Sequence, residues 1–226
     1  MRAARLVLLF VLILSPSPRL NSQQSTTIPQ RDAQAISVMS QMAAATGWGT
    51  AGLPSDALAS GTVTRYKGDV QDIVNVILKA KGSKLYRAQV QEPLLSFADP
   101  SFAVQYLGTE TIANQTTHRI AISPQPSSSD PAAPLRSRAN RLVVWISESS
   151  GFPLQIAYVR ISTDNPTASR LVTRAFSDYR VVNGIAVPFH QDEFGGEQRS
   201  FSLQLTTVIL NAGLRDTDFA LPVLQD

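Results

Sequence analysis

The chain has 226 residues and no cysteine, which excludes disulfide bonds, a thiolate nucleophile and cysteine-bound metal. Its formal net charge of +3 includes Arg2, Arg5 and Arg19, which lie in a segment with the pattern of an export signal. Without these three residues the chain is close to neutral, and this argues against a nucleic-acid partner.

Residues 1–23 are predicted to be a secretory signal peptide. Arg2 and Arg5 precede an unbroken apolar run at residues 6–14, and a polar stretch rich in serine and proline follows. The run is shorter than the roughly 20 residues that span a bilayer. We expect the mature protein to begin at residues 21–24. An exported protein without cysteine is more typical of the bacterial periplasm than of the small secreted domains that disulfide bonds stabilise.

Residues 24–56 are predicted to form a polar lead-in and one helix at residues 32–46. Asp32 lies in its first turn, and Gly47 follows as a stop signal. The apolar residues recur at intervals of three and four, so they share one helical face: Ala33, Ile36, Met39, Met42 and Ala43.

Residues 57–226 are predicted to form one antiparallel sheet. Asn183-Gly184, between two apolar runs, is the strongest hairpin signal, because both central residues of a type I′ turn need positive φ. A turn is also expected at Asn114-Gln115, a flexible loop at residues 124–134, and a short helical turn or loop at residues 93–102. The strands are expected at residues 58–66, 70–79, 85–91, 104–112, 116–122, 142–147, 152–161, 170–179, 185–194 and 198–209.

The predicted fold class is therefore α+β: a curled antiparallel β half-barrel of about ten strands with an N-terminal helix packed on the sheet. No enzymatic motif accompanies it. His190 and Asp192 share a strand face, but two ligands fall short of the three or four usual for zinc. There is no Gly-x-Ser-x-Gly nucleophile motif. We predict no catalytic residue, metal or cofactor, and a protein that is not an enzyme.

A set of apolar residues in successive strands is the remaining functional signal. These residues could form an ordinary core closed by the helix. One short helix gives little cover for about ten strands, however, so part of the face is predicted to remain as a groove for an acyl chain or hydrophobic peptide. The groove residues are Trp145, Ile156, Tyr158, Phe176, Phe201, Leu203 and Leu205.

Three stretches resemble the periplasmic lipoprotein-carrier superfamily, the LolA-like and RseB-like half-barrels. They are residues 106–122, beginning Tyr106-Leu-Gly-Thr-Glu110, residues 144–154 with Gly151 and Pro153 in a hairpin, and residues 176–189 with the closing Phe219-Ala-Leu-Pro222. The resemblance implies an antiparallel half-barrel of eleven strands with helices over its concave face.

The function predicted from these features is that of an exported, non-enzymatic binding protein. It would hold a lipid, acyl chain or lipoprotein in the half-barrel groove, with transient contact to membrane-bound partners. The alternative is an envelope sensor or protein-interaction module of the RseB type, which the same fold would serve.

Overall fold

The computed structural model describes residues 30–49, 54–81, 94, 96–125, 141–161 and 168–219. The predicted signal peptide at residues 1–23 and the predicted strand at residues 85–91 lie outside these ranges. In chain order the elements are α1 (Ala33–Ala45), β1 (Asp56–Lys67), β2 (Val70–Lys81), η1 (Ser96–Ala98), β3 (Phe102–Ile112), β4 (Gln115–Pro124), β5 (Leu142–Ser147), β6 (Pro153–Ile161), β7 (Ser169–Val182), β8 (Ile185–Gly195), β9 (Gln198–Leu210) and η2 (Asp216–Phe219).

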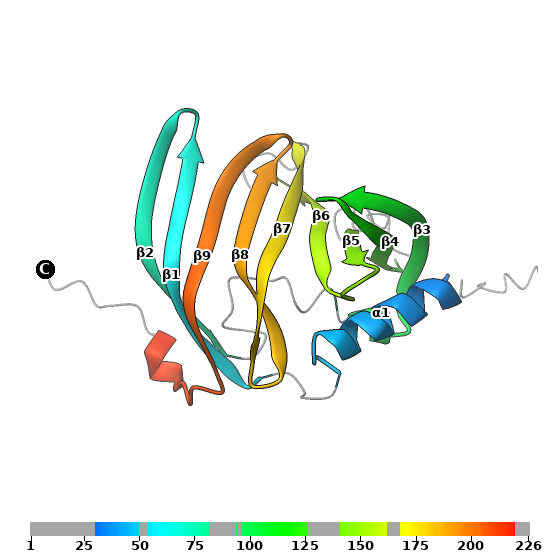
Figure 1. The fold of residues 1–226 in the computed structure, drawn as a ribbon, viewed down its shortest axis with the longest axis horizontal. Helices are drawn as coiled ribbons and strands as arrows, with labels where there is room; N and C mark the ends of the chain where they lie inside the picture. Colours follow the sequence, from blue (N-terminus) through cyan, green and yellow to red (C-terminus); the bar gives the residue numbers. More distant parts are fainter. Residues whose placement is uncertain are drawn as a thin grey trace, which may run out of the picture.

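The described strands form one nine-stranded antiparallel sheet in the order β2-β1-β9-β8-β7-β6-β5-β4-β3. It is a meander from β3 to β9, to which the β1–β2 hairpin is added through β1 and β9. β2 and β3 are the two edges, so the curled sheet stays open (Figure 1). The predicted α+β half-barrel is confirmed. Among the described residues, no helix has the length and apolar character needed to cross a bilayer.

The two predicted hairpin turns contain residues with positive φ. Asn183 and Gly184 have φ values of 50° and 81°, as the predicted type I′ turn between β7 and β8 requires. The turn between β3 and β4 lies one residue earlier than predicted, at Ala113 (φ 48°) and Asn114 (φ 61°), because β4 already begins at Gln115. The predicted helical turn within residues 93–102 is present as η1.

Helix α1 begins at an aspartate cap. Asp32 is the residue before the helix, and its Oδ1 accepts hydrogen bonds from the backbone N–H groups of Gln34 (2.8 Å) and Ala35 (3.3 Å). The buried face differs from the predicted one, because Ala33 is exposed and Ile36 is only partly buried. The buried residues are Ala35, Val38, Met39, Met42 and Ala43, so the helix is rotated relative to the face expected from spacing alone.

The lead-in to α1 is tied to the edge strand β3. The backbone N–H of Asp32 donates to the carbonyl of Val104 (2.8 Å), and the Val104 N–H donates to the carbonyl of Gln30 (2.9 Å). The Arg31 guanidinium donates to the carbonyls of Phe97 (2.7 Å), Asp99 (2.7 Å) and Phe102 (3.0 Å). These bonds fix where the helix starts.

The other end of α1 rests on the β7–β8 turn. The Thr46 carbonyl accepts a hydrogen bond from the Ala186 N–H (2.8 Å). Gly47 has φ +77°, and a Cβ placed on it would lie 2.0 Å from the Gly184 carbonyl oxygen. Gly151, in the β5–β6 turn, approaches the helix as well, because a Cβ there would lie 2.8 Å from the Ala45 Cβ. Glycine is therefore required for the helix end to sit this close to the two turns.

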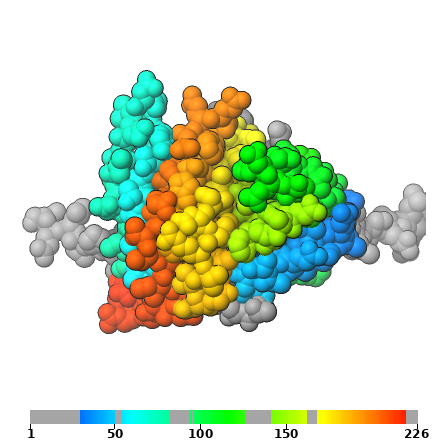
Figure 2. Space-filling model, viewed as in Figure 1, coloured from blue at the N-terminus to red at the C-terminus, as the bar shows by residue number. Residues whose placement is uncertain are grey.

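The buried residues form two clusters. The helix cluster contains residues of α1, Leu94, Phe97 and the inner face of β3–β6, with contributions from β7, β8 and the end of β9. The sheet cluster lies at the other end, on β8 and β9: Phe189, Leu203 and Leu205, with partly buried neighbours on β1, β2 and β7. No α1 residue belongs to the described sheet cluster. Figure 2 shows α1 (blue) beside the green strands and the β1–β2 hairpin (cyan) on the opposite side of the molecule.

Candidate functional site

The predicted groove residues are divided between the two clusters and the outer face of the sheet. Three belong to or pack against the helix cluster: Ile156, Tyr158 and Phe176. Three belong to or pack against the sheet cluster: Phe201, Leu203 and Leu205. The structure thus places six of the seven in two separate groups.

Trp145 lies on the opposite face, and its predicted place beside the others is wrong. Val144 is paired with Ile156, while Trp145 is paired with Gln155, and successive strand residues point to opposite faces. The Trp145 indole N–H instead donates to Glu110 Oε2 (2.9 Å), which also accepts a hydrogen bond from Arg119 Nη1 (3.1 Å). Trp145 is therefore hydrogen-bonded within a polar group, together with Glu110 and Arg119, on the outer face of the sheet.

Exposure further distinguishes the six inner residues. Ile156, Phe176, Leu203 and Leu205 are buried among their neighbours, whereas Tyr158 and Phe201 are only partly buried. A side chain that is already packed cannot contact a ligand unless its neighbours move. Tyr158 and Phe201 are therefore the members that a ligand can reach in the described arrangement.

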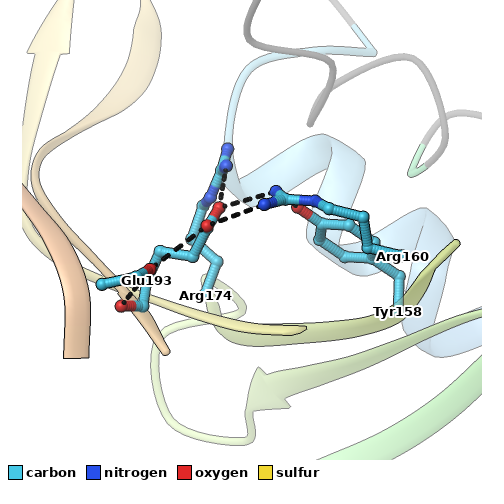
Figure 3. A network of polar contacts seen from close by, with 5 residues as sticks. Tyr158, Arg160, Arg174 and Glu193 are labelled. Atoms are coloured by element: carbon cyan, nitrogen blue, oxygen red, sulfur yellow. Dashed lines mark hydrogen bonds and ion pairs between the residues drawn. The ribbon is translucent and has the colours of Figure 1, made fainter. Parts of the chain in front are cut away.

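A charged group connects the two apolar clusters, and we call Arg160, Arg174 and Glu193 the Arg–Glu cluster. Glu193 Oε2 accepts from Arg174 Nη2 (2.7 Å) and from Arg160 Nη2 (3.2 Å), and Glu193 Oε1 accepts from Arg160 Nη1 (3.3 Å) (Figure 3). The Ser200 hydroxyl donates to the Glu193 backbone carbonyl (3.1 Å). One carboxylate thus holds two guanidinium groups, which leaves one net positive charge.

The position of the Arg–Glu cluster follows from strand register. Arg174 is paired with Ile156 on β6 and with Glu193 on β8, and Glu193 is paired with Phe201 on β9. Paired residues of an antiparallel ladder share a face, so the charges lie on the inner face, between the two apolar clusters.

Both arginines also lie over aromatic rings. The Arg174 guanidinium is 5.4 Å from the ring centre of Phe201, and that of Arg160 is 5.8 Å from the ring centre of Tyr158. Arg160 Nη2 also donates to the Tyr158 hydroxyl (2.9 Å). The two ligand-accessible aromatic residues are therefore held by the two arginines.

The electrostatics of this group depend on its burial. The Glu193 side chain is 4% exposed, that of Arg174 11% and that of Arg160 42%. Burial alone would raise the pKa of Glu193, but the hydrogen bonds and charges of Arg174 and Arg160 together hold it below its usual range. The Arg174 Nε is buried without a hydrogen-bond partner, so the cluster retains an unused donor. Arg160 is the member whose charge is accessible to solvent.

Arg160, Arg174 and Glu193 were not among the predicted site residues, although the sequence contains a signal for them. The inner-facing positions of β6 are Ile156, Tyr158 and Arg160, and Arg174 lies between apolar inner positions of β7. A charge on an otherwise apolar strand face is costly unless it is paired. That interruption marks such positions as candidates for a buried ion pair or a site.

The histidines lie elsewhere. His190 and Asp192 share a face as predicted, with 3.2 Å between His190 Nε2 and Asp192 Oδ2, and His190 Nδ1 lies 2.9 Å from Gln204 Oε1. This pair is on the outer face, because its residues alternate with Glu193. No group of three or more histidine, aspartate or glutamate side chains suited to hold a metal occurs among the residues that the structure describes.

Comparison with known proteins identifies the fold. No protein-family model matches the chain, and no curated protein sequence matches it. A solved domain from Vibrio parahaemolyticus, named for outer-membrane lipoprotein sorting, superposes with a TM-score of 0.53 at 13% identity, covering 82% of this chain and 96% of that one. A DUF1329 family protein from Desulfovibrio piger superposes with a TM-score of 0.52 at 12% identity, covering 87% of this chain and all of that one.

A LolA superfamily protein from Nitrosomonas europaea is similar at a TM-score of 0.47 and 11% identity, covering 83% of this chain and 97% of that one. At identities of 12–13%, the likeness to the Vibrio parahaemolyticus and Desulfovibrio piger proteins establishes the fold alone. Over the described residues, the open sheet and the N-terminal helix share that fold, which supports the LolA-like fold that the sequence resemblance implied, with nine described strands in place of eleven.

Proposed function

We propose that the protein is an exported, non-enzymatic binding protein that holds a lipid, an acyl chain or a lipidated protein on the inner face of its open sheet. One observation carries the proposal: the Arg–Glu cluster lies between two apolar clusters, on the inner face of a sheet that is not closed. The fold that the chain shares with a domain named for lipoprotein sorting supports the same class of ligand.

The chemistry of the face suits an amphipathic ligand. Apolar burial contributes about 0.8 kcal/mol per methylene before ordering costs, so affinity should rise with acyl-chain length. Tyr158 and Phe201 are the points of first contact. The exposed guanidinium of Arg160 is placed to interact with a carboxylate or phosphate at the head of the chain.

The test is a titration of the purified protein with a fluorescent long-chain fatty acid. We expect saturable binding that weakens as the chain is shortened and that depends little on salt, because most of the affinity is apolar. Phe201→Asp should weaken binding directly, whereas Phe176→Asp should weaken it by disturbing the packing beneath the inner face, because Phe176 is buried. Val181→Asp is the matched control, because Val181 is exposed and belongs to neither cluster core.

Two further measurements separate site from fold. Phe176 is buried, so circular dichroism must show that its variant is folded before its binding is interpreted. Arg160→Gln should weaken the binding of a free fatty acid more than the binding of its methyl ester, since only the acid carries the charge that Arg160 would contact. Absence of saturable binding by the wild type would contradict the proposal, and binding of unfolded envelope peptides instead would favour the RseB-type module.

Export is part of the proposal and rests on the N-terminal sequence. Arg2 and Arg5 before the short apolar run predict that residues 1–23 are removed and that the protein acts in the bacterial periplasm. N-terminal sequencing of the protein from its host should begin at residues 21–24. Retention of Met1 would refute cleavage.

A further inference from the structure

One more arginine continues the Arg–Glu cluster on the inner face. Arg170 on β7 is paired directly with Arg160 on β6, so the two side chains share that face, and both are exposed. The Cβ atoms of directly paired residues are about 5 Å apart, and like charges in such a pair destabilise a sheet. Locally unfavourable arrangements of this kind are expected at functional sites.

Both arginine side chains lean toward β8. Arg160 reaches the carboxylate of Glu193, as Figure 3 shows. Arg170 lies over Gly195, because a Cβ placed on this glycine would be 3.1 Å from Arg170 Nη1 and 3.5 Å from Arg170 Cζ. Glu193 and Gly195 are two residues apart on one strand, so they share a face and are about 7 Å apart. The two guanidinium groups therefore lie over neighbouring inner-face positions of β8.

The charges of this group do not balance. Glu193 forms ion pairs with Arg174 (2.7 Å) and with Arg160 (3.2 Å), and Arg170 is not one of its partners. Three arginines and one glutamate together carry a net positive charge of two. The group is therefore suited to an anion that carries more than one negative charge.

Arg160 can turn from Glu193 to a ligand without leaving a buried charge unpaired. Its two contacts with Glu193, at 3.2 and 3.3 Å, are longer than the 2.7 Å contact of Arg174, which would remain. The Tyr158 hydroxyl accepts a hydrogen bond from Arg160 Nη2 (2.9 Å), so its own hydrogen is directed away from Arg160. That hydrogen can be donated to an oxygen atom of the same ligand.

Two guanidinium groups and a hydroxyl donor match a phosphate monoester better than a carboxylate. A phosphate monoester carries about two negative charges at neutral pH and has three strong acceptor oxygens. A carboxylate carries one charge on two oxygens. The planar donor groups of arginine fit phosphate oxygens in pairs.

We propose that the inner face binds an amphiphile with a phosphate monoester head, held by Arg160, Arg170 and the Tyr158 hydroxyl, while its chain lies on Phe201 and the sheet cluster. This inference rests on the proposed function, since it names the head group of the amphipathic ligand. Arg170 is then a residue that determines specificity.

The test is the displacement of the fluorescent fatty acid by dodecyl phosphate, dodecanoate and dodecanol. We expect dodecyl phosphate to bind most tightly and dodecanol most weakly. Arg170→Gln should weaken the binding of dodecyl phosphate about tenfold, through loss of one charged hydrogen-bond donor, and leave that of dodecanol unchanged. Arg199→Gln is the matched control, because Arg199 is also partly exposed but lies 3.6 Å from Asp192 on the outer face.

Gly195→Ala tests the geometry without changing any charge. A Cβ at residue 195 would displace the Arg170 guanidinium, so this variant should lose much of the preference for phosphate over carboxylate. Circular dichroism of both variants verifies that they are folded. Equal affinity of the wild type for dodecyl phosphate and dodecanoate, or an Arg170→Gln variant that keeps the preference, would overturn this inference but not the proposed function.

Two other outcomes have different meanings. Failure of all three amphiphiles to displace the probe would overturn both proposals. Inorganic phosphate should compete only weakly, because it has no chain to bury. Displacement by inorganic phosphate at the same concentration as by dodecyl phosphate would indicate a site for the free anion and would overturn the assignment to an amphiphile.

Discussion

Replacing Glu193 with glutamine tests whether burial makes the Arg–Glu cluster important for stability. Glu193 and Arg174 are both nearly inaccessible, and breaking such a pair by removing one partner costs about 3–5 kcal/mol. Arg160 is partly exposed, so its contact adds at most about 1 kcal/mol. Glutamine keeps one acceptor oxygen, so the expected decrease in the free energy of unfolding is near the lower end of this range, about 3 kcal/mol. With a urea m-value of about 2–3 kcal/mol/M, the midpoint should fall by about 1 M.

The matched control is Asp178→Asn. Asp178 accepts from Arg180 at 2.6 Å, which is shorter than the 2.7 Å contact between Arg174 and Glu193, but both members of the control pair are exposed. We expect no resolvable shift of its urea midpoint, because exposed ion pairs contribute little. Equal decreases of the urea midpoint for Glu193→Gln and Asp178→Asn would show that burial does not determine how much each ion pair contributes to stability.

Three further predictions follow from named contacts. The pKa of Glu193 is lower in the folded state than in the unfolded state. Ionised Glu193 therefore adds to the free energy of unfolding above its unfolded pKa of about 4.3, and this stabilisation is lost as the pH falls through the pKa of the folded state. The stability gap between the wild type and Glu193→Gln, measured by urea titration at several pH values, should therefore close in acid and not at neutral pH. Gly47→Ala should destabilise the protein more than Gly184→Ala, although both residues have positive φ, because only a Cβ at Gly47 would clash with a carbonyl oxygen. Similar decreases in the melting temperature of the two variants would exclude that clash as the cause. Trp145→Phe should lower the unfolding free energy by about 1 kcal/mol through loss of the hydrogen bond to Glu110, and thermal denaturation that shows no change would mean that the bond is replaced by water.

Much of the fold was predictable because its signals are local. Asn183-Gly184 requires positive φ whatever surrounds it, and strand alternation depends only on neighbouring residues. The helix ends are also local, since Asp32 caps the start and Gly47 follows the end. The buried face of α1 was shifted because the docking of the helix end on the β7–β8 turn, not residue spacing, sets its rotation.

The site was less predictable because it depends on register between strands. Trp145 and Ile156 are both apolar and lie on adjacent strands, but a one-residue difference in pairing places them on opposite faces. The pairing of β5 with β6 shifts between Trp145 and Ile146, and that of β8 with β9 shifts between Glu193 and Phe194. Such irregularities change which residues face inward. Arg160, Arg174 and Glu193 come from three strands, so only the assembled sheet brings them together.

The place of β9 in the sheet has a consequence for the order in which the protein can fold. β9 is the last of the described strands, yet it lies between β8 and β1, and it joins the early β1–β2 hairpin to the rest of the sheet. Thr62 is paired with Gln204, so this contact closes a very long segment of chain and is entropically costly until the other strands are in place. We expect hydrogen exchange during refolding to protect β4–β8 before β1 and β2. A chain synthesised from its N-terminus therefore leaves the β1–β2 hairpin without its neighbouring strand until β9 is available.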